Sequence, residues 1–221
     1  MTSVLAAALG AQASLLRPEV AEYVAGAPSP GDAAGSESAP SPVAGSGQPR
    51  RGVGEGLFTR AGSPLRGLLA LARPLVGPGL LITRWERDVP FRIVNAPTGS
   101  AALAAHRSFC FEGGEQVAED VLVPTGRPGG LLDLLGRERR IEVALRASAT
   151  EAGHLLLEST GVRVRLGRAH VPLPGPLGVS VRVEGGFDDE LGRHTIAARI
   201  ANPLVGTVLA YTGWFDYRYE D

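Results

Sequence analysis

The feature that most constrains the fold is an alternation of apolar and polar residues that begins after Gly79 and runs through most of the remaining chain. Val89, Phe91 and Ile93, for example, occupy every second position. A period of two places alternate side chains on opposite faces of an extended strand. The pattern predicts about nine strands, over 89–94, 107–112, 116–123, 141–146, 154–160, 162–166, 179–184, 196–200 and 207–219.

The segments between these strands are short and rich in turn-forming residues, as in Gly126–Gly130 and Asp188–Glu190. A parallel crossover needs a dozen or more residues, so consecutive strands must run antiparallel. We therefore expect a mainly β domain, built as a large curved antiparallel sheet or a partly closed barrel. N-terminal helices and one amphipathic helix over Leu65–Val76 are expected to pack on it.

The chain divides into three predicted segments, 1–25, 26–56 and 57–221. Residues 1–25 read as helices, the second opened by Pro18. In 26–56, 23 of the 31 residues are Gly, Ala, Pro or Ser, so this segment buries too little apolar surface to fold and is expected to be a disordered linker. Residues 57–221 form the β-rich domain.

Composition excludes several classes of function. Every basic residue is arginine, so there is no lysine for a phosphate-binding loop or a Schiff base. The net charge of −1 disfavours nucleic-acid binding. The most apolar window, 65–82, contains two arginines and two prolines and predicts no membrane span, and the N-terminus lacks the basic start of a signal peptide. We expect a cytoplasmic protein.

Candidate metal and catalytic residues are few. His106 and Cys110 lie on one face of a predicted strand, but about 13 Å apart, too far to share a zinc ion, so we read them as a rim histidine and a buried thiol. Gly52–Gly56 lacks the spacing of a nucleotide loop and reads as a flexible hinge. We expect no metal, no cofactor and no catalytic residues, and we lean against an enzyme. A hydrolase or isomerase that uses carboxylates is kept as a third alternative.

Aromatic residues are concentrated in the last strand, where Tyr211 and Phe215 share one face and Trp214 takes the other. They could anchor the strand in the core, or they could line a cavity. Our first functional hypothesis is a non-enzymatic module that holds an apolar ligand, such as a lipid or isoprenoid, within the curved sheet. Its candidate ligand-binding residues are Tyr211, Trp214, Phe215 and Trp85.

The alternative hypothesis is a protein-interaction module. Arginines at alternating positions would give one face of the sheet a basic surface for an acidic partner, since the planar guanidinium suits such contacts. Cross-strand acids such as Glu142 and Glu184 could instead neutralise that face. The candidate residues are Arg163, Arg165, Arg182 and Arg199.

Several segments together resemble one known family. They are, in order, Trp85–Phe91, His106–Gly114, Gly129–Gly136, Val171–Pro174 and Ala201–Trp214. With its Leu-Pro repeat and its closing Pro-Leu-x-Gly and Tyr-x-Gly motifs, the chain is similar to the family called domain of unknown function 4166 over about residues 57–219.

The resemblance implies a bacterial protein with no assigned activity, and it assigns no site residues. Some members of that family follow an oxidoreductase-like or membrane domain on the same chain. This chain has no such neighbour, so the resemblance implies that it acts alone or as an accessory to an oxidoreductase or membrane protein.

Overall fold

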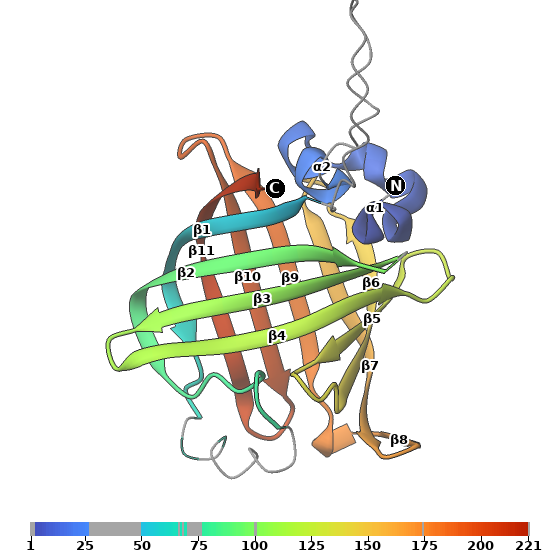
Figure 1. Ribbon diagram of the computed structural model, residues 1–221, viewed down its shortest axis with the longest axis vertical. Coiled ribbons are helices and arrows are strands. Elements are labelled where there is room, and N and C mark those ends of the chain that lie inside the picture. Colours follow the sequence, from blue (N-terminus) through green and yellow to red (C-terminus); the bar gives the residue numbers. More distant parts are fainter. Residues whose placement is uncertain are drawn as a thin grey trace, which may run out of the picture.

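The computed structural model describes residues 3–26, 50–65, 67, 69, 77–99, 101–173 and 175–220. Its main feature is a closed antiparallel barrel of ten strands, with an eleventh strand attached at one side (Figure 1). The prediction of a mainly β, curved antiparallel sheet is therefore confirmed, and the sheet closes fully.

The elements are short helices at the N-terminus followed by strands. The helical elements are α1 (Val4–Leu9), η1 (Gly10–Leu15), α2 (Pro18–Ala25) and η2 (Gly175–Leu177). The strands are β1 (Arg51–Gly62), β2 (Trp85–Thr98), β3 (Ala102–Phe111), β4 (Gly114–Pro124), β5 (Gly130–Leu135), β6 (Ile141–Ala149), β7 (Leu155–Leu166), β8 (Ala169–Pro172), β9 (Ser180–Asp188), β10 (Arg193–Asn202) and β11 (Gly206–Glu220).

The barrel is an up-and-down meander. Each strand from β1 to β7 pairs with the next, and β9, β10 and β11 continue the series. The short β8 folds back on β7 alone and stands outside the ring. The ring closes where β1 pairs with β11 along nearly its whole length, from Arg51↔Glu220 to Gly62↔Ala210.

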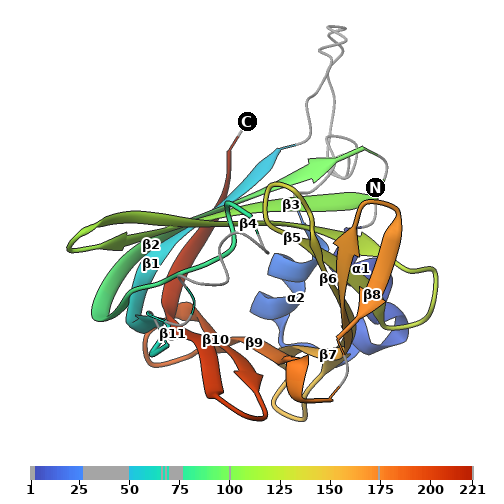
Figure 2. The ribbon, with the colours of Figure 1, turned by 90° about the horizontal axis from the view of Figure 1, so that it is seen from below.

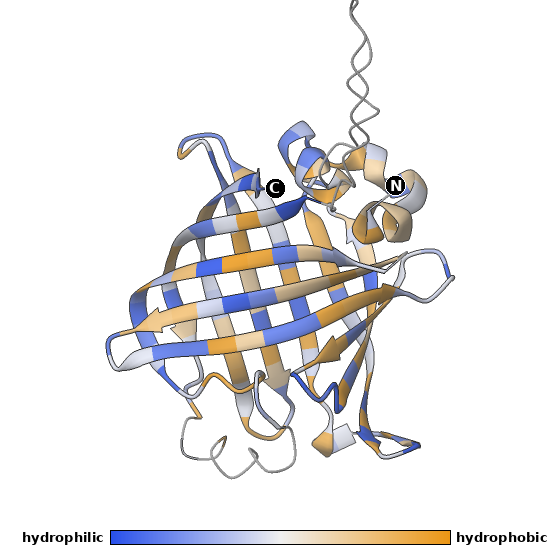
Figure 3. Cartoon of the chain, in the orientation of Figure 1, coloured by the Kyte–Doolittle hydropathy of each residue, from blue (hydrophilic) through white to orange (hydrophobic). Residues whose placement is uncertain are grey.

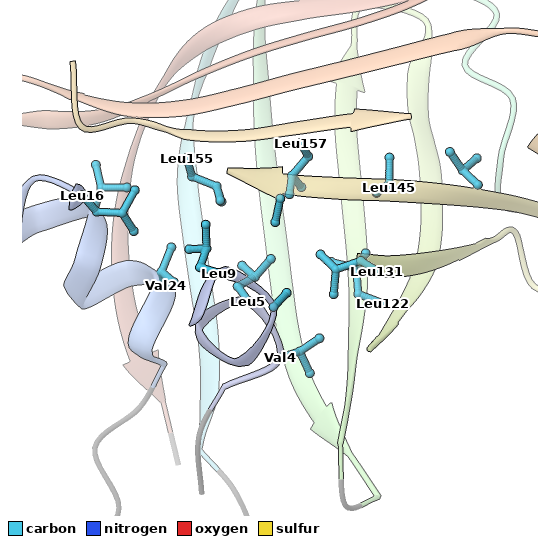
Figure 4. Packing of buried hydrophobic residues seen from close by; sticks show 14 of the residues in the cluster. Val4, Leu5, Leu9, Leu16, Val24, Leu122, Leu131, Leu145, Leu155 and Leu157 are labelled. Carbon is cyan, nitrogen blue, oxygen red and sulfur yellow. The ribbon is translucent and has the colours of Figure 1, made fainter. Parts of the chain in front are cut away.

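Two buried clusters fill the interior. One joins the aromatic residues of β1, β2, β3 and β11, including Phe58 and Phe109. The other joins α1 and α2 to the inner faces of β4 to β7. Figure 4 shows Leu5 and Leu9 of α1 beside the leucines of β7 in this second cluster. Along the strands, apolar and polar residues alternate as expected for an inner and an outer face (Figure 3).

The helices lie across one end of the barrel, and α2 is seen within the ring of strands from the opposite end (Figure 2). Backbone hydrogen bonds fasten them there: Arg17 N–H donates to Gly153 O over 2.9 Å, and Gly129 N–H donates to Ala8 O over 2.8 Å. The N-terminal helices therefore share the core of the β-rich domain.

Several boundaries predicted from the sequence need correction. Strand β1 begins at Arg51, so the end of the expected linker, 51–56, is strand, and Gly52–Gly56 is no hinge. The predicted strands 154–160 and 162–166 are one strand, β7, while β1, β5 and β8 were missed. Most of the linker, 27–49, and most of the amphipathic helix predicted over 65–76 lie outside the described residues.

The glycines of β1 explain why the strand was missed. A Cβ on Gly54 would lie 2.6 Å from Ile93 Cγ2, and one on Gly56 would lie 2.0 Å from the carbonyl oxygen of Trp214. The first half of β1 carries only glycine on its inner face, because Ile93 of β2 and the aromatic residues and backbone of β11 occupy that space, whereas Phe58 fills the inner face farther along the strand. Three glycines in six residues disfavour a strand by propensity, but tertiary packing requires them here.

Candidate functional site

Three charged side chains lie on the inner face of the barrel, on adjacent strands. Each of them is two positions from a buried apolar residue of the same strand and therefore lies on the same, inner face. The pairs are Arg107 and Phe109 on β3, Asp120 and Leu122 on β4, and Asp133 and Leu131 on β5. In the register of the sheet Arg107 opposes Ala118, and Asp120 opposes Leu135. Successive members are therefore diagonal neighbours, roughly 7–8 Å apart between Cα atoms. They form one oblique line, which we call the interior polar cluster.

The polar cluster is only partly satisfied. Arg107 Nη1 forms an ion pair with Asp120 Oδ1. The other oxygen of Asp120, Oδ2, and Asp133 Oδ1 are buried, and neither has a hydrogen-bond partner in the described part of the chain. The Asp120 side chain is 3% exposed, whereas Arg107 keeps 24% of its side-chain surface accessible. Buried acceptors without partners are uncommon in folded proteins and call for an explanation.

Burial changes the pKa of one member of this cluster, Asp133. It raises the pKa of Asp133 from 3.8 to about 7, and the nearby positive charge of Arg107 opposes that rise. A carboxyl group that titrates near neutrality inside a barrel is a recognised mark of a functional site, although structural ion pairs also perturb pKa values.

Tyrosines from two other elements face the same interior. Tyr211 of β11 lies on the far side of the ring from β5, and Tyr23 reaches in from α2. Burial raises the pKa of both hydroxyls, while the charge of Arg107 lowers it. Burial also raises the pKa of Tyr217, whose hydroxyl accepts a hydrogen bond from Asn95 Nδ2 at 3.1 Å. These phenols remain neutral at physiological pH and can act as hydrogen-bond donors.

Aromatic rings line the wall beside the polar cluster. Phe58 stacks on Phe91 with ring centroids 3.7 Å apart, and Tyr211 packs on Phe58 at 4.9 Å and on Phe109 at 5.7 Å. His194 stacks on Phe215 at 5.3 Å, and burial lowers the pKa of its imidazole. The inner surface around the charges is thus apolar.

The structure separates the four predicted ligand-binding residues into two pairs. Tyr211 and Phe215 face the interior, where Phe215 is buried. Trp214 and Trp85 lie on the outer surface, where the guanidinium of Arg193 covers Trp214 at 4.0 Å and that of Arg60 covers Trp85 at 5.5 Å. These two tryptophans cannot contact a ligand held with Tyr211 inside the barrel.

The four predicted arginines all point outward but do not form one patch. Arg182 and Arg199 are directly opposite each other on β9 and β10. Arg163 and Arg165 lie where β7 has left β9 and pairs with β8 instead. Arg182 has acidic partners in Glu158, at 2.7 Å, and Glu184, at 3.3 Å. In contrast, Arg199 reaches only the hydroxyl of Thr207 within the described residues, at 3.3 Å.

Cys110 and His106 lie on the outer face of β3. The thiol is exposed, which corrects the expectation that it is buried: the inner positions of β3 are the odd-numbered ones, such as Phe109. His106 pairs with Glu119 at 3.2 Å. Among the described residues, no three potential ligands are grouped to hold a metal ion.

The sequence reasoning missed the interior polar cluster. The available signal was the inward position of Arg107 and Asp120 in two predicted strands; Asp133 lies on β5, whose apolar run does not alternate and was not predicted as a strand. The alternation was used to find strands, but its charged exceptions were not followed up.

Comparison with known families places the chain. The profile of the family described as "Domain of unknown function (DUF4166)" matches residues 44–215, most of the barrel. The chain belongs to the DUF4166 family. The resemblance found in the sequence is thereby confirmed, and the matched region runs from before β1 into β11, the two strands that close the barrel.

The chain is also similar to a protein of Bacillus subtilis. The DUF4166 chain is 24% identical over 133 residues to the protein called "Uncharacterized protein YndH" of Bacillus subtilis (strain 168). The match covers 58% of this chain, and the chain spans 65% of the length of that relative. Within the described residues, no helix is both long and apolar enough to cross a membrane.

Proposed function

We propose that this protein binds one small apolar molecule inside the barrel, with the polar end of that molecule at Arg107, Asp120 and Asp133. The observation that carries the proposal is the interior polar cluster, because a barrel stabilised by apolar burial has no need of three ionisable side chains on its inner face. Buried ion pairs contribute little to stability compared with apolar residues of similar size. A binding role accounts for their presence.

The dimensions of the barrel support this proposal. Barrels of eight strands can hold one small ligand, and the diameter grows with strand number, so ten strands enclose more space. Side chains and the N-terminal helices fill part of it. The accessible surface of Arg107, 24% of a side chain on the inner face, indicates that space remains next to the polar cluster.

A gap in the wall offers a route inward. Strands β7 and β9 are paired only over four residues, Leu155–Glu158. Beyond this ladder a depression of about 450 Å³ lies between the two strands, lined among others by Ser159, Val162 and Val179. Val162 belongs to the buried cluster, so the floor of the depression reaches the core. We propose this gap as the entrance.

Titration with Nile red, a neutral apolar dye, tests the proposal. We expect saturable binding with a stoichiometry of one. Ala118→Leu adds bulk on the inner face opposite Arg107 and should weaken binding several-fold. The matched control is Ala197→Leu, which adds the same bulk on the exposed outer face and should leave binding unchanged.

The outcomes separate the alternatives. If Ala197→Leu weakens binding and Ala118→Leu does not, the dye sits on the outer surface and the proposal is wrong. Tyr211→Phe provides a second inner variant that keeps the packing of the ring; it should melt normally and bind the dye with altered affinity. An unchanged titration for both inner variants would also contradict an interior site.

A second function is favoured by the outer surface. A groove of about 200 Å³ is lined by three arginines and one acid, among other residues: Arg60, Arg182, Arg199 and Glu184, with Trp85 beside them. Like charges directly opposite on neighbouring strands are destabilising, so the Arg182–Arg199 pair is not explained by stability. Neither Arg60 nor Arg199 has an acidic partner within the described residues. We propose that an acidic segment of a protein partner binds here.

Binding to immobilised poly-L-glutamate at low salt tests this second function. Arg199→Ala should reduce retention more than Arg168→Ala, which removes the same charge from the exposed β7–β8 turn. Equal losses for the two variants would show a response to net charge alone and would exclude a specific site.

A further inference from the structure

The hydrogen-bonding inventory of the interior polar cluster specifies the chemistry of the ligand that we propose above. Arg107 is the only cation of the cluster, and Asp120 Oδ1 already engages it. Arg107 has further N–H donors, but its side chain is 24% exposed and water can reach it. The buried atoms of the cluster that lack a partner among the residues described are acceptors, Asp120 Oδ2 and Asp133 Oδ1. A buried polar atom without a partner destabilises the folded protein, and more so when it is charged.

The charge balance leads to the same conclusion. Arg107 and Asp120 neutralise each other, and Asp133 adds either nothing or one negative charge. No positive charge is left over for a carboxylate or a phosphate. An anionic head group would meet two carboxyl groups and would be repelled whenever Asp133 is ionised.

We infer that the barrel takes an apolar molecule whose head group donates hydrogen bonds, an alcohol or an amine, and that Asp120 and Asp133 accept them. The inference rests on the proposed interior site and adds the class of ligand. Asp120 anchors it geometrically, because its side chain is 97% buried, is held on one oxygen by Arg107 and presents the other oxygen to the interior. The apolar remainder of the ligand would lie against the aromatic wall.

The alcohol and the amine differ in their response to pH. An ammonium group gains from an ionised Asp133, whereas a hydroxyl group can donate to either carboxylate. Because burial sets the pKa of Asp133 to about 7, amine binding should strengthen between pH 6 and pH 8, and alcohol binding should not.

Competition against bound Nile red tests the inference with four molecules of equal chain length: decanol, decylamine, decanoic acid and decyl methyl ether, all below their micellar concentrations. We expect decanol or decylamine to bind at least about tenfold more tightly than the ether, which has no donor, and than the acid at pH 8. Tenfold corresponds to one hydrogen bond to a charged group.

Each outcome decides one of the two claims. If Nile red binds and all four compounds compete equally, or the acid competes best, the interior site stands and the ligand class is wrong. If Nile red does not bind and direct titration calorimetry detects no binding of any of the four compounds, the interior site itself is wrong. Asp133→Asn provides the internal check, because it should abolish the pH dependence of amine binding, while at about pH 4.5, where burial keeps Asp133 of the parent protonated, it should change the melting temperature by no more than a few degrees.

Discussion

At the scale of single residues, Asp133 links the stability of the protein to pH. Between its ordinary pKa of 3.8 and its folded pKa of about 7, the folded state holds a proton that the unfolded chain has released. The contribution of this group to stability is therefore fully present below about pH 4 and is lost as the pH rises through 7. A pKa change of this size corresponds to at most about 4 kcal/mol.

Asp133→Asn removes that titration while keeping the shape of the side chain. The free energy of unfolding of the variant should increase relative to that of the parent as the pH rises from 4.5 to 8, because only the parent must bury an ionised carboxylate. Urea unfolding of both proteins at several pH values measures the difference. A difference that stays constant with pH would mean that Asp133 is solvated in the folded state.

The alternation of residues predicted that Tyr211 and Phe215 share one face, and the structure shows that this face is the inner one. The alternation could not show which strands would face each other across the closed ring. It therefore could not predict that Tyr211 lies near Arg107 and Asp133. Trp85 was assigned to the ligand site with no such pattern behind it, and the structure places it outside. Parity is a local property, whereas proximity across a barrel depends on strand number and register.

At the scale of elements, the glycine-rich sequence of β1 is required by its packing against β11. The glycines of β1 and the aromatic residues of β11 are complementary across one ladder, from Gly52↔Tyr219 to Gly56↔Phe215. Strand propensity alone made residues 51–56 read as linker. The alternating strands β2, β3, β4, β6, β9, β10 and β11 were predictable because their apolar residues repeat with the required period.

Replacing Gly56 with Ala should therefore destabilise the protein by roughly 1–3 kcal/mol, since the new Cβ would lie 2.0 Å from a backbone atom of β11. The matched variant is Gly185→Ala on β9, where a Cβ meets no atom within 4 Å. That substitution should be neutral or stabilising by about 0.4–1 kcal/mol. Chemical denaturation compares them, and equal effects would contradict the role assigned to the glycines of β1.

The helices provide a second contrast between two positions. Leu5 of α1 is 6% exposed within the core cluster, whereas Leu15 of η1 is 63% exposed. Leu5→Ala should lower the free energy of unfolding by about 2–5 kcal/mol, and Leu15→Ala should change it by no more than about 0.5 kcal/mol. If Leu5→Ala has as little effect as Leu15→Ala, then α1 does not pack in the barrel in solution.

At the scale of the whole molecule, the shared core predicts one cooperative unit. Unfolding followed by the fluorescence of Trp85 and Trp214, which lie on β2 and β11, should coincide with unfolding followed by far-ultraviolet circular dichroism. Two separate transitions would show that the helical segment melts independently of the strands. In the same experiment, the variant that lacks residues 1–25 should be less stable, so its unfolding midpoint should lie at a lower denaturant concentration than that of the full chain.

The pairing of β1 with β11 has a consequence for biosynthesis. All other ladders of the ring join strands that are neighbours in sequence, or nearly so, and they can form as the ribosome makes them. The second edge of β1 has no partner until Gly206–Glu220 has been made. An open strand edge readily pairs with other chains. The nascent protein therefore keeps an open strand edge from the synthesis of β1 until that of β11, and the glycines at positions 52, 54 and 56 leave the inner face of the first half of β1 without side chains that would strengthen such mispairing.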